Sequence, residues 1–216
     1  MAAIQIFKKN ESERKLEMLA YDADLELFRD NFKRFMSEHI APHYEQWERE
    51  GLMPRSVWTL LGENGFLCVD VPEEYGGYGV PTHYSLMLVE ESARAGYCAL
   101  STGISCHSEI AAPYIQHIGT EEQKQYWLPK MVSGEAVGAI GMTEPGAGSD
   151  LQAMRTSAIL QDDHYLLNGS KTFISNGQHA DVVVLAVKTD PQARAKGVSL
   201  LLVDTHLDGF KKGTNL

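Results

Sequence analysis

The apolar residues in the first half of the chain recur at the spacing of an α-helix. From position 25 they fall three, four and three residues apart, so that they share one helical face: Leu25, Phe28, Phe32 and Phe35. Comparable stretches predict four more helices, over residues 56–62, 83–95, 105–117 and 121–132. Because such apolar faces are buried against one another, the first half predicts a core of packed helices.

Two local signals mark the ends of these elements. Thr120 followed three residues later by Gln123 fits a capping box at the start of the last helix, and Gly134 lies just past its end. The stretch VPEEYGGYGVP, residues 71–81, is too rich in Gly and Pro for regular structure, so we expect a loop between helices there.

After Gly134 the pattern changes to short runs of β-branched and aliphatic residues, which predict strands. These runs cover residues 135–143, 154–160, 164–168, 170–175, 180–189 and 196–204. The Asn168-Gly169 pair predicts a tight hairpin turn between the third and fourth runs. We therefore expect an α+β protein, with an N-terminal all-helical domain over 1–134 followed by an antiparallel, barrel-like β domain over 135–216.

Composition narrows the classes of function. The 216 residues carry 29 acidic and 19 basic side chains, a net charge of -10, which argues against nucleic acid because clustered Lys and Arg bind phosphate backbones. Cys68, Cys98 and Cys106 have no Cys-x-x-Cys spacing, so they predict neither a disulfide framework nor a thiolate metal site. Residues 1–19 lack a signal-peptide core and no apolar run reaches membrane-spanning length, so we expect a cytoplasmic protein.

The stretch MTEPGAGSD, residues 142–150, concentrates the candidate chemistry. Gly146 and Gly148 supply the first two glycines of a dinucleotide fingerprint, but Leu151 takes the third position and no strand-helix-strand unit surrounds them. A Walker A motif fails as well, since no Gly-Lys-Ser/Thr follows. Two interpretations remain: a turn built on Pro145 and Gly146, or a loop whose hydroxyls and bare backbone N–H groups bind a polar ligand.

Other candidate groups lack the partners that catalysis or metal binding needs. His39 and His43 have the spacing of a helical metal pair, but no third ligand is evident, so we expect no metal site. Ser105 and His107 lie outside any nucleophile-elbow motif. Two pairs of adjacent acids are expected to be solvated rather than catalytic: Glu73-Glu74 in the predicted loop, and Glu90-Glu91 in a predicted helix, where neighbouring side chains face different directions.

Three motifs together carry a resemblance to a known family. PEEYGG, then AIGMTEPGAGSDLQ, then NGSKTFISNG make the chain similar to the acyl-CoA dehydrogenase family of flavoproteins over essentially its whole length. HSEI, IGTEEQKQYWLPKMVSGE and KTFISN are more similar to the long-chain branch than to the short- or medium-chain branches.

The resemblance implies FAD as cofactor and assigns contacts in MTEPGAGSD. It places the backbone of Ile140, Met142 and Thr143, with the Thr143 hydroxyl, against the polar edge of the flavin ring, where hydrogen bonds stabilise the negative charge of the reduced form. Gly148 and Ser149 would approach the FAD diphosphate or the bound acyl-CoA, and Ser149 is the expected substrate contact.

The resemblance also assigns contacts in KTFISN. Phe173 takes a position often held by Trp, where the ring stacks on the flavin, and Ser175 takes the position of a hydroxyl residue near flavin N5. Ile174, between them, is a further expected cofactor contact. Phe keeps the ring face without the indole N–H, and Ile140 replaces an aromatic residue of some relatives while keeping the backbone contact.

The reaction implied is α,β-dehydrogenation of a fatty acyl-CoA thioester, with a carboxylate base and FAD as hydride acceptor. The partners implied are fatty acyl-CoA, electron-transfer flavoprotein and further copies of the chain in a homo-oligomer. In the family, the catalytic glutamate and a C-terminal helical bundle lie at positions beyond Leu216, so no residue of this chain is expected to be the base.

Two other functions stay open. The chain could be a truncated, non-catalytic relative that binds acyl-CoA or a full-length partner subunit. It could also be a relative with different flavin chemistry, such as an acyl-CoA oxidase or a flavin-dependent hydroxylase. The MTEPGAGSD motif favours the dehydrogenase, because those relatives usually depart from it.

Overall fold

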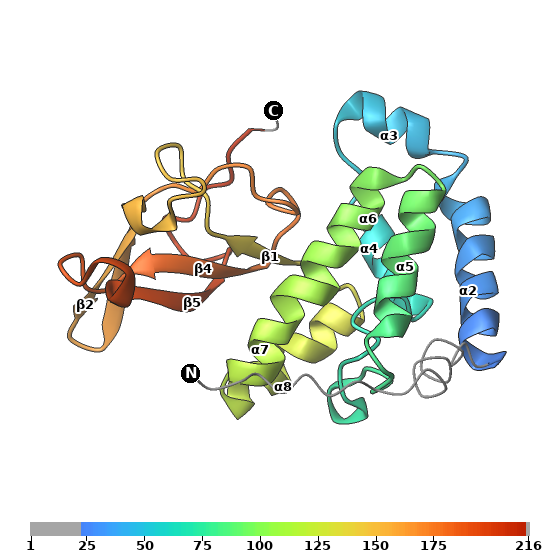
Figure 1. Cartoon of the computed structure of the whole chain (residues 1–216), viewed down its shortest axis with the longest axis horizontal. Coiled ribbons are helices and arrows are strands. Elements are labelled where there is room, and N and C mark those ends of the chain that lie inside the picture. Colours follow the sequence, from blue (N-terminus) through green and yellow to red (C-terminus); the bar gives the residue numbers. More distant parts are fainter. Residues whose placement is uncertain (1–22, 215–216) are drawn as a thin grey trace, which may run out of the picture.

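The structure of the protein, a computed structural model, describes residues 23–214. The helical segments are α2 (Ala23–Phe35), η1 (Met36–Ile40), α3 (Tyr44–Glu50), α4 (Ser56–Glu63), η2 (Glu73–Tyr75), α5 (His83–Arg94), α6 (Cys98–Ile104), η3 (Ser105–Ala111), α7 (Ala112–Ile118) and α8 (Glu121–Val132). The strands are β1 (Gly138–Gly141), β2 (Ser157–Gln161), β3 (His164–Asn168), β4 (Val182–Lys188) and β5 (Val198–Asp204), with the short helices η4 (Leu151–Ala153) and η5 (Arg194–Gly197) between them. Helices gather at one end of the molecule and strands at the other (Figure 1), which confirms the α+β class.

The expectation that residues 1–19 are not a signal peptide concerns positions outside the described residues.

Helix α2 buries the face that the apolar spacing predicted, through Leu25, Phe32 and Phe35. The Phe32 ring meets the Phe66 ring edge-on, with centroids 4.9 Å apart. Burial of one such side chain stabilises the fold by about 1.5–3 kcal/mol, so this seam holds α2 on the bundle.

Helices α6, η3 and α7 form one continuous helix, which lies beside the sheet (Figure 1). It begins at Cys98 and ends at Ile118, so the helix predicted over 105–117 is confirmed but is longer than expected. Its middle segment, η3, is a wide π-helix. Segments of this kind are rare and occur frequently at functional sites, because they change which side chains face a neighbouring element.

Helix α8 begins with the predicted capping box. The Gln123 backbone N–H donates to Thr120 Oγ1 at 3.3 Å, and the Thr120 N–H donates to Gln123 Oε1 at 2.9 Å. Beyond the helix, Gly134 has a φ of 73°, and an added Cβ would lie 2.1 Å from the Trp58 carbonyl oxygen. Glycine at this position therefore both turns the chain and lets it pass close to helix α4.

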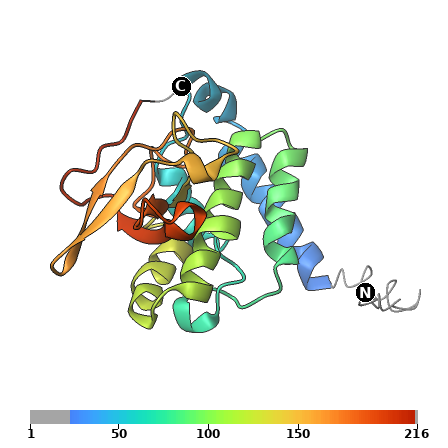
Figure 2. The same cartoon turned by 60° about the vertical axis from the view of Figure 1, so that its left-hand side comes forward.

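The sheet is mixed rather than wholly antiparallel. Its strand order is β1-β4-β2-β3, and β5 lies off this path, paired with β4. β4 runs parallel to β1 and β2 and antiparallel to β5, while β2 and β3 form an antiparallel hairpin. Figure 2 shows this hairpin extending away from the helices. All side chains of β4 but one are buried, as expected for a central strand.

Two local predictions in the second half are wrong. Residues 170–175 are not a strand, and Asn168-Gly169 is not the hairpin turn. The β2–β3 hairpin closes instead at Asp162-Asp163, where Asp162 takes a positive φ of 52°. Gly169 is required for packing, because an added Cβ would lie 2.3 Å from Thr156 Oγ1. A glycine that makes room for a neighbour looks the same in sequence as a glycine that makes a turn.

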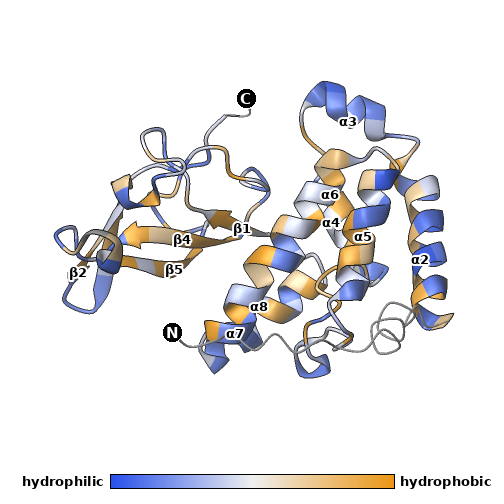
Figure 3. Ribbon diagram, viewed as in Figure 1, coloured by the Kyte–Doolittle hydropathy of each residue, from blue (hydrophilic) through white to orange (hydrophobic). Residues whose placement is uncertain are grey.

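An arginine joins the helices to the sheet. Arg55, which precedes α4, donates to the carbonyl oxygens of Gly134 and Glu135 and pairs with Asp181 Oδ2 at 2.9 Å. The same Asp181 oxygen accepts the Val137 N–H at 2.8 Å. Figure 3 shows β4 as an almost wholly hydrophobic strand and α3 as mostly hydrophilic.

Candidate functional site

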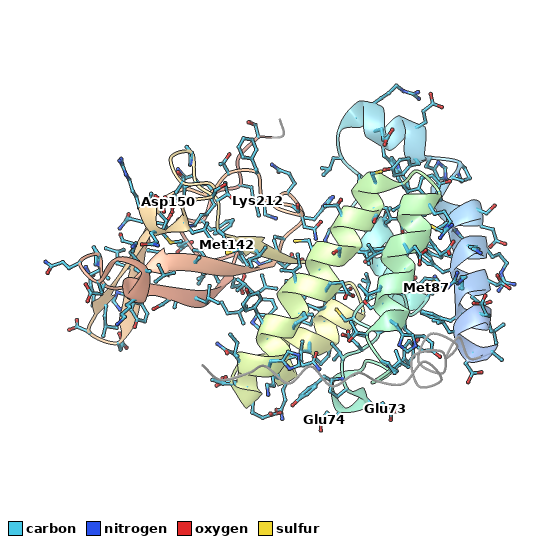
Figure 4. All side chains as sticks on the ribbon, viewed as in Figure 1. Glu73, Glu74, Met87, Met142, Asp150 and Lys212 are labelled. Atoms are coloured by element: carbon cyan, nitrogen blue, oxygen red, sulfur yellow. The ribbon has the colours of Figure 1, made fainter. Side chains whose placement is uncertain are left out.

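A pocket of about 350 Å³ lies where the sheet meets helices α5, α6 and η3. Six of the eight residues predicted to bind a cofactor line it: Ile140, Met142, Thr143, Phe173, Ile174 and Ser175. Figure 4 shows Met142 in this central position, between the strands and the helical bundle. The structure therefore brings together two segments that lie thirty residues apart in the sequence.

These two segments are the end of β1 and the strap, a name used here for residues 171–176. Strand β1 ends at Gly141, and the chain leaves the sheet at Met142 and Thr143. The Thr172 N–H donates to the Thr143 carbonyl oxygen at 2.9 Å, so the strap lies along this stretch rather than in the sheet. Residues 170–175 have the composition of a strand, but this contact holds them beside residues 142–143 instead of in the sheet.

Asn176 anchors the end of the strap to both halves of the molecule. Its side-chain N–H₂ donates to the Gly103 carbonyl oxygen of α6 at 3.0 Å and to the Gly138 carbonyl oxygen of β1 at 3.2 Å. Its φ is 63°, in the left-handed region that Asn tolerates better than most residues. The strap is thus held at each end by hydrogen bonds to fixed elements.

Phe173 is held in an unfavourable way at the mouth of the pocket. Its φ is 56°, and its side chain is 72% exposed. A left-handed conformation in a bulky residue costs on the order of 1–3 kcal/mol, and an exposed ring returns little of that through burial. Residues kept in such a state are concentrated at ligand sites, so this position favours a binding role for the ring.

Glu144 is a structural residue of the MTEPGAGSD loop. Glu144 and Ala147 exchange backbone hydrogen bonds of 2.9 and 3.1 Å around Pro145 and Gly146, so the turn interpretation holds for these four residues. The Glu144 carboxylate is buried; it pairs with Lys171 and accepts two backbone N–H groups. Burial raises the pKa of this carboxyl, but the hydrogen bonds lower it by more, so that the pKa is about 2. The carboxylate is therefore ionised at neutral pH.

Gly148 and Ser149 lie outside the pocket. Both are exposed, and a Cβ added at Gly148 would meet no atom within 4 Å. Packing within the described residues does not require glycine at 148, and the surface there is open to a ligand. Asp150, next in the chain, lies on the sheet side of the molecule in Figure 4.

The helical wall of the pocket is the part that sequence reasoning missed. It consists of Val89, Ser101, Thr102, Ser105, Cys106 and Ile110. Three of these residues belong to the π-helix η3, which the apolar periodicity does not reveal. The run STGISCHS, residues 101–108, was the available signal, because small and hydroxyl-bearing side chains on a buried helix leave room for a ligand.

His107 is a buried structural residue. The Gly138 N–H donates to His107 Nδ1 at 2.9 Å, so Nδ1 carries no proton and Nε2–H donates to the Met131 carbonyl oxygen at 3.0 Å. Burial lowers its pKa to about 4, which keeps the ring neutral. The neutral ring joins η3 to the end of α8 and the start of β1.

Carboxylates are absent from the pocket lining among residues 23–214. Glu73 and Glu74 lie at the lower edge of the molecule, away from Met142 (Figure 4). Glu91 departs from the expectation of a solvated acid: it is 4% exposed and lies within 4.0 Å of Arg29, Lys33 and Arg94. The sequence pattern did not reveal this burial because the cations come partly from another helix.

Residues 23–214 hold no group of three or more His, Cys, Asp or Glu side chains placed to bind a metal ion. In the same part of the chain, helices that combine the length and apolar character of a membrane span are not found.

Comparison with known proteins agrees with the fold. Residues 22–135 match the family described as "Acyl-CoA dehydrogenase, N-terminal domain", and residues 139–216 match "Acyl-CoA dehydrogenase, middle domain". The chain is 40% identical over 198 residues to the long-chain specific acyl-CoA dehydrogenase, mitochondrial, of Sus scrofa, an alignment that covers 91% of this chain and 46% of that protein. The chain thus spans about half the length of this relative.

Solved structures show the same likeness. The crystal structure of acyl-CoA dehydrogenase from Geobacillus kaustophilus superposes with a TM-score of 0.85 at 49% identity, over 88% of this chain and 50% of that chain. The acyl-CoA dehydrogenase of Bacillus anthracis, solved in complex with FAD, superposes with a TM-score of 0.79 at 31% identity, over 88% of this chain and 33% of that chain.

The fold is that of the helical N-terminal part and the mixed-sheet middle part of these enzymes, with the pocket between the two. The chain belongs to the acyl-CoA dehydrogenase family. This confirms the resemblance carried by the MTEPGAGSD and KTFISN motifs.

Proposed function

We propose that this chain supplies the FAD-binding and acyl-CoA-binding half of an acyl-CoA dehydrogenase site. The observation that carries the proposal is the pocket in which the end of β1 and the strap converge, lined by six of the eight residues that the family resemblance assigned to the cofactor. The family membership and the FAD complex of the Bacillus anthracis relative support it.

The residues present fit FAD. The Thr143 N–H and hydroxyl have no partner among residues 23–214, so they are free to donate to a ligand. The exposed Phe173 ring offers a stacking face, and the open surface at Gly148 leaves room for a diphosphate. Ile140, Met142, Ile174 and Ser175 complete the wall. FAD would supply the hydride acceptor for the reaction.

The substrate that we propose is a fatty acyl-CoA thioester, with Ser149 as a contact. Likeness to the long-chain specific enzyme of Sus scrofa supports a long acyl chain. The family resemblance implies that the base that removes the α-proton is none of these 216 residues, and the pocket lining in the described part, which contains no carboxylate, supports this proposal. Electron-transfer flavoprotein is the proposed electron acceptor.

We further propose that residues 1–134 and 135–216 are separate domains and that the protein works as a homo-oligomer. The helical and sheet parts of the structure support the first proposal. A cytoplasmic location is only the expectation from the sequence, whereas the name of the Sus scrofa relative places that protein in mitochondria. The compartment therefore stays a prediction.

The proposal is tested by adding FAD to the purified 216-residue chain, recording its absorbance spectrum, and then adding a long-chain acyl-CoA without oxygen. Bound flavin that keeps its colour supports a half-site whose base comes from elsewhere. Bleaching would show that this chain contains the base and would overturn the half-site. Failure to bind FAD would overturn the cofactor assignment. The alternative function, non-catalytic binding of acyl-CoA or of a partner subunit, would then be favoured.

A further inference from the structure

Lys171 places a buried positive charge beside the pocket wall. Its side chain is 8% exposed, and its Nζ donates to Glu144 Oε1 at 2.8 Å and to the Met142 carbonyl oxygen at 3.1 Å. Its stem runs close to the end of β1, where a Cβ added at Gly141 would lie 3.5 Å from Lys171 Cγ. The ammonium group is therefore one hydrogen bond away from the backbone that lines the pocket.

The bond to Met142 acts on the peptide group that Met142 shares with Thr143. A hydrogen bond accepted by a peptide oxygen draws electron density from the nitrogen and makes the N–H of the same peptide a stronger donor. The Thr143 carbonyl is bonded to the Thr172 N–H, whereas the Thr143 N–H has no partner among residues 23–214. The hydrogen bond from Lys171 therefore strengthens the Thr143 N–H as a donor, and this N–H is available to a ligand.

A buried ion pair of this kind is weak evidence for a role in fold stability. Replacing a buried ion pair by apolar residues of similar volume is often neutral or stabilising, because burying two charges costs free energy. Glu144 is itself fixed by the N–H groups of Arg155 and Thr156, at 2.6 and 3.0 Å, so the carboxylate holds Lys171 in one place. The pair thus fixes the direction in which the cation acts on the Met142 carbonyl.

We propose that Lys171 is a positioning residue that polarises the Met142–Thr143 peptide and so strengthens the hydrogen bond from the Thr143 N–H to reduced flavin. The inference rests on the proposed function, in which this N–H meets the polar edge of the flavin ring. Reduction adds negative charge at that edge, and a stronger donor stabilises the added charge more than it stabilises the oxidised ring. Lys171 therefore raises the preference of the site for reduced flavin.

The test compares the affinities of oxidised and reduced FAD for the parent chain and for Lys171→Met. We expect the preference for reduced FAD to fall about tenfold, which corresponds to a midpoint potential lower by about 30 mV for a two-electron couple. The double variant Lys171→Met with Glu144→Leu leaves no unpaired buried charge and should show the same loss. Lys196→Met, at an exposed position of η5, is the matched control and should leave the potential unchanged.

A structural role alone would weaken both redox forms of FAD equally, and an unchanged potential in a folded, FAD-binding double variant would overturn the inference. A second readout needs no flavin: the Thr143 amide proton resonance should move upfield in Lys171→Met, and an unmoved resonance would also contradict polarisation. If the parent chain binds no FAD, both the proposed function and the inference that rests on it are wrong. If the parent binds FAD and the potential does not move, only the inference fails.

Discussion

At the scale of single residues, the candidate site contains groups that lack a hydrogen-bond partner or are largely exposed within the described residues. The Thr143 N–H and hydroxyl adjoin the pocket without a partner, and Phe173 is exposed at a positive φ. The positive φ of Phe173 costs free energy within the chain. Each of these features is explained if a planar, polar cofactor meets it, and the Thr143 hydroxyl and the Phe173 ring can each be removed by one substitution.

Thr143→Val should weaken FAD binding by about 1 kcal/mol, roughly fivefold in Kd, because one hydrogen bond from the hydroxyl is lost and the side chain keeps its shape. Titration of the chain with FAD, followed by flavin fluorescence, measures the change. Thr59→Val, on the exposed side of α4, is the control and should leave the affinity unchanged. An equal affinity in parent and Thr143→Val would refute this contact.

Phe173→Ala should weaken FAD binding by about 0.5–1.5 kcal/mol through lost stacking. The unfolding free energy of the flavin-free chain should change little, because the ring is exposed and buries little apolar surface. Tyr165→Ala removes a ring from the exposed β2–β3 hairpin and serves as the control. Bound-flavin fluorescence identical to that of the parent would argue against stacking.

At the scale of elements, the π-helix η3 carries titratable groups that link it to its neighbours, and His107 and Glu109 are the two with the largest consequences for stability. His107 bonds to the Met131 carbonyl and the Gly138 N–H, as described above. Two residues on, Glu109 is half-buried and contacts the Ser85 hydroxyl of α5. Burial and the nearby Asp70 raise the pKa of Glu109 to about 7. The stability of this helix should therefore depend on pH in two directions.

His107 should make the protein less stable in acid. Its pKa is about 4 when folded and about 6.5 when unfolded, so the unfolded chain binds more protons between these values. The contribution is fully present above pH 6.5, and the free energy of unfolding should fall by up to about 3 kcal/mol as the pH drops to 4. Urea unfolding at several pH values measures this fall. His164→Gln, an exposed control, should retain the slope, whereas His107→Gln should reduce it.

Glu109→Gln should have the opposite pH signature. Because the folded pKa is raised, stability is greatest below the unfolded pKa of the carboxyl and is lost as the pH rises through about 7. The amide removes the cost of the buried charge, so the variant should be more stable than the parent by about 1 kcal/mol at pH 8, allowing for partial screening by water, with little difference at pH 5. Glu90→Gln, on α5, is the exposed control. A gain equal at both pH values would contradict the assignment.

At the scale of the whole molecule, the pocket exists only while the helices and the sheet keep their relative position. Arg55 and Asp181 connect the start of α4 to the chain around β1, and Asn176 ties the strap to α6. The site is therefore a property of the interface between the two halves rather than of either half.

Arg55→Met should lower the free energy of unfolding by about 3 kcal/mol, because it leaves the partly buried Asp181 carboxylate without its cation and frees two backbone carbonyls. FAD affinity should fall as well, since the two walls of the pocket are no longer held in register. Arg49→Met breaks only an exposed pair with Glu45 and should cost less than about 0.5 kcal/mol. Equal stability of the two variants would show that Arg55 does not join the halves.

Much of this molecule could be predicted from the sequence because the signals are local. The helical face of α2 follows from a spacing of three and four residues, and the start of α8 follows from Thr120 and Gln123. Six of the eight candidate site residues share one pocket, because the MTEPGAGSD and KTFISN motifs each keep their residues together in the chain.

Tertiary structure alone decided the rest, and the reason is that each remaining feature depends on a partner distant in sequence. Residues 170–175 have the composition of a strand, but they lie outside the sheet, where the Thr172 N–H donates to the Thr143 carbonyl oxygen. Glycine at 169 makes room for Thr156, which no turn rule reports. The sequence by itself determined the helices, the order of the two halves and the motifs; tertiary contacts decided the strand directions, the π-helical wall and the buried Lys171–Glu144 pair, because pairing and burial belong to the packed chain.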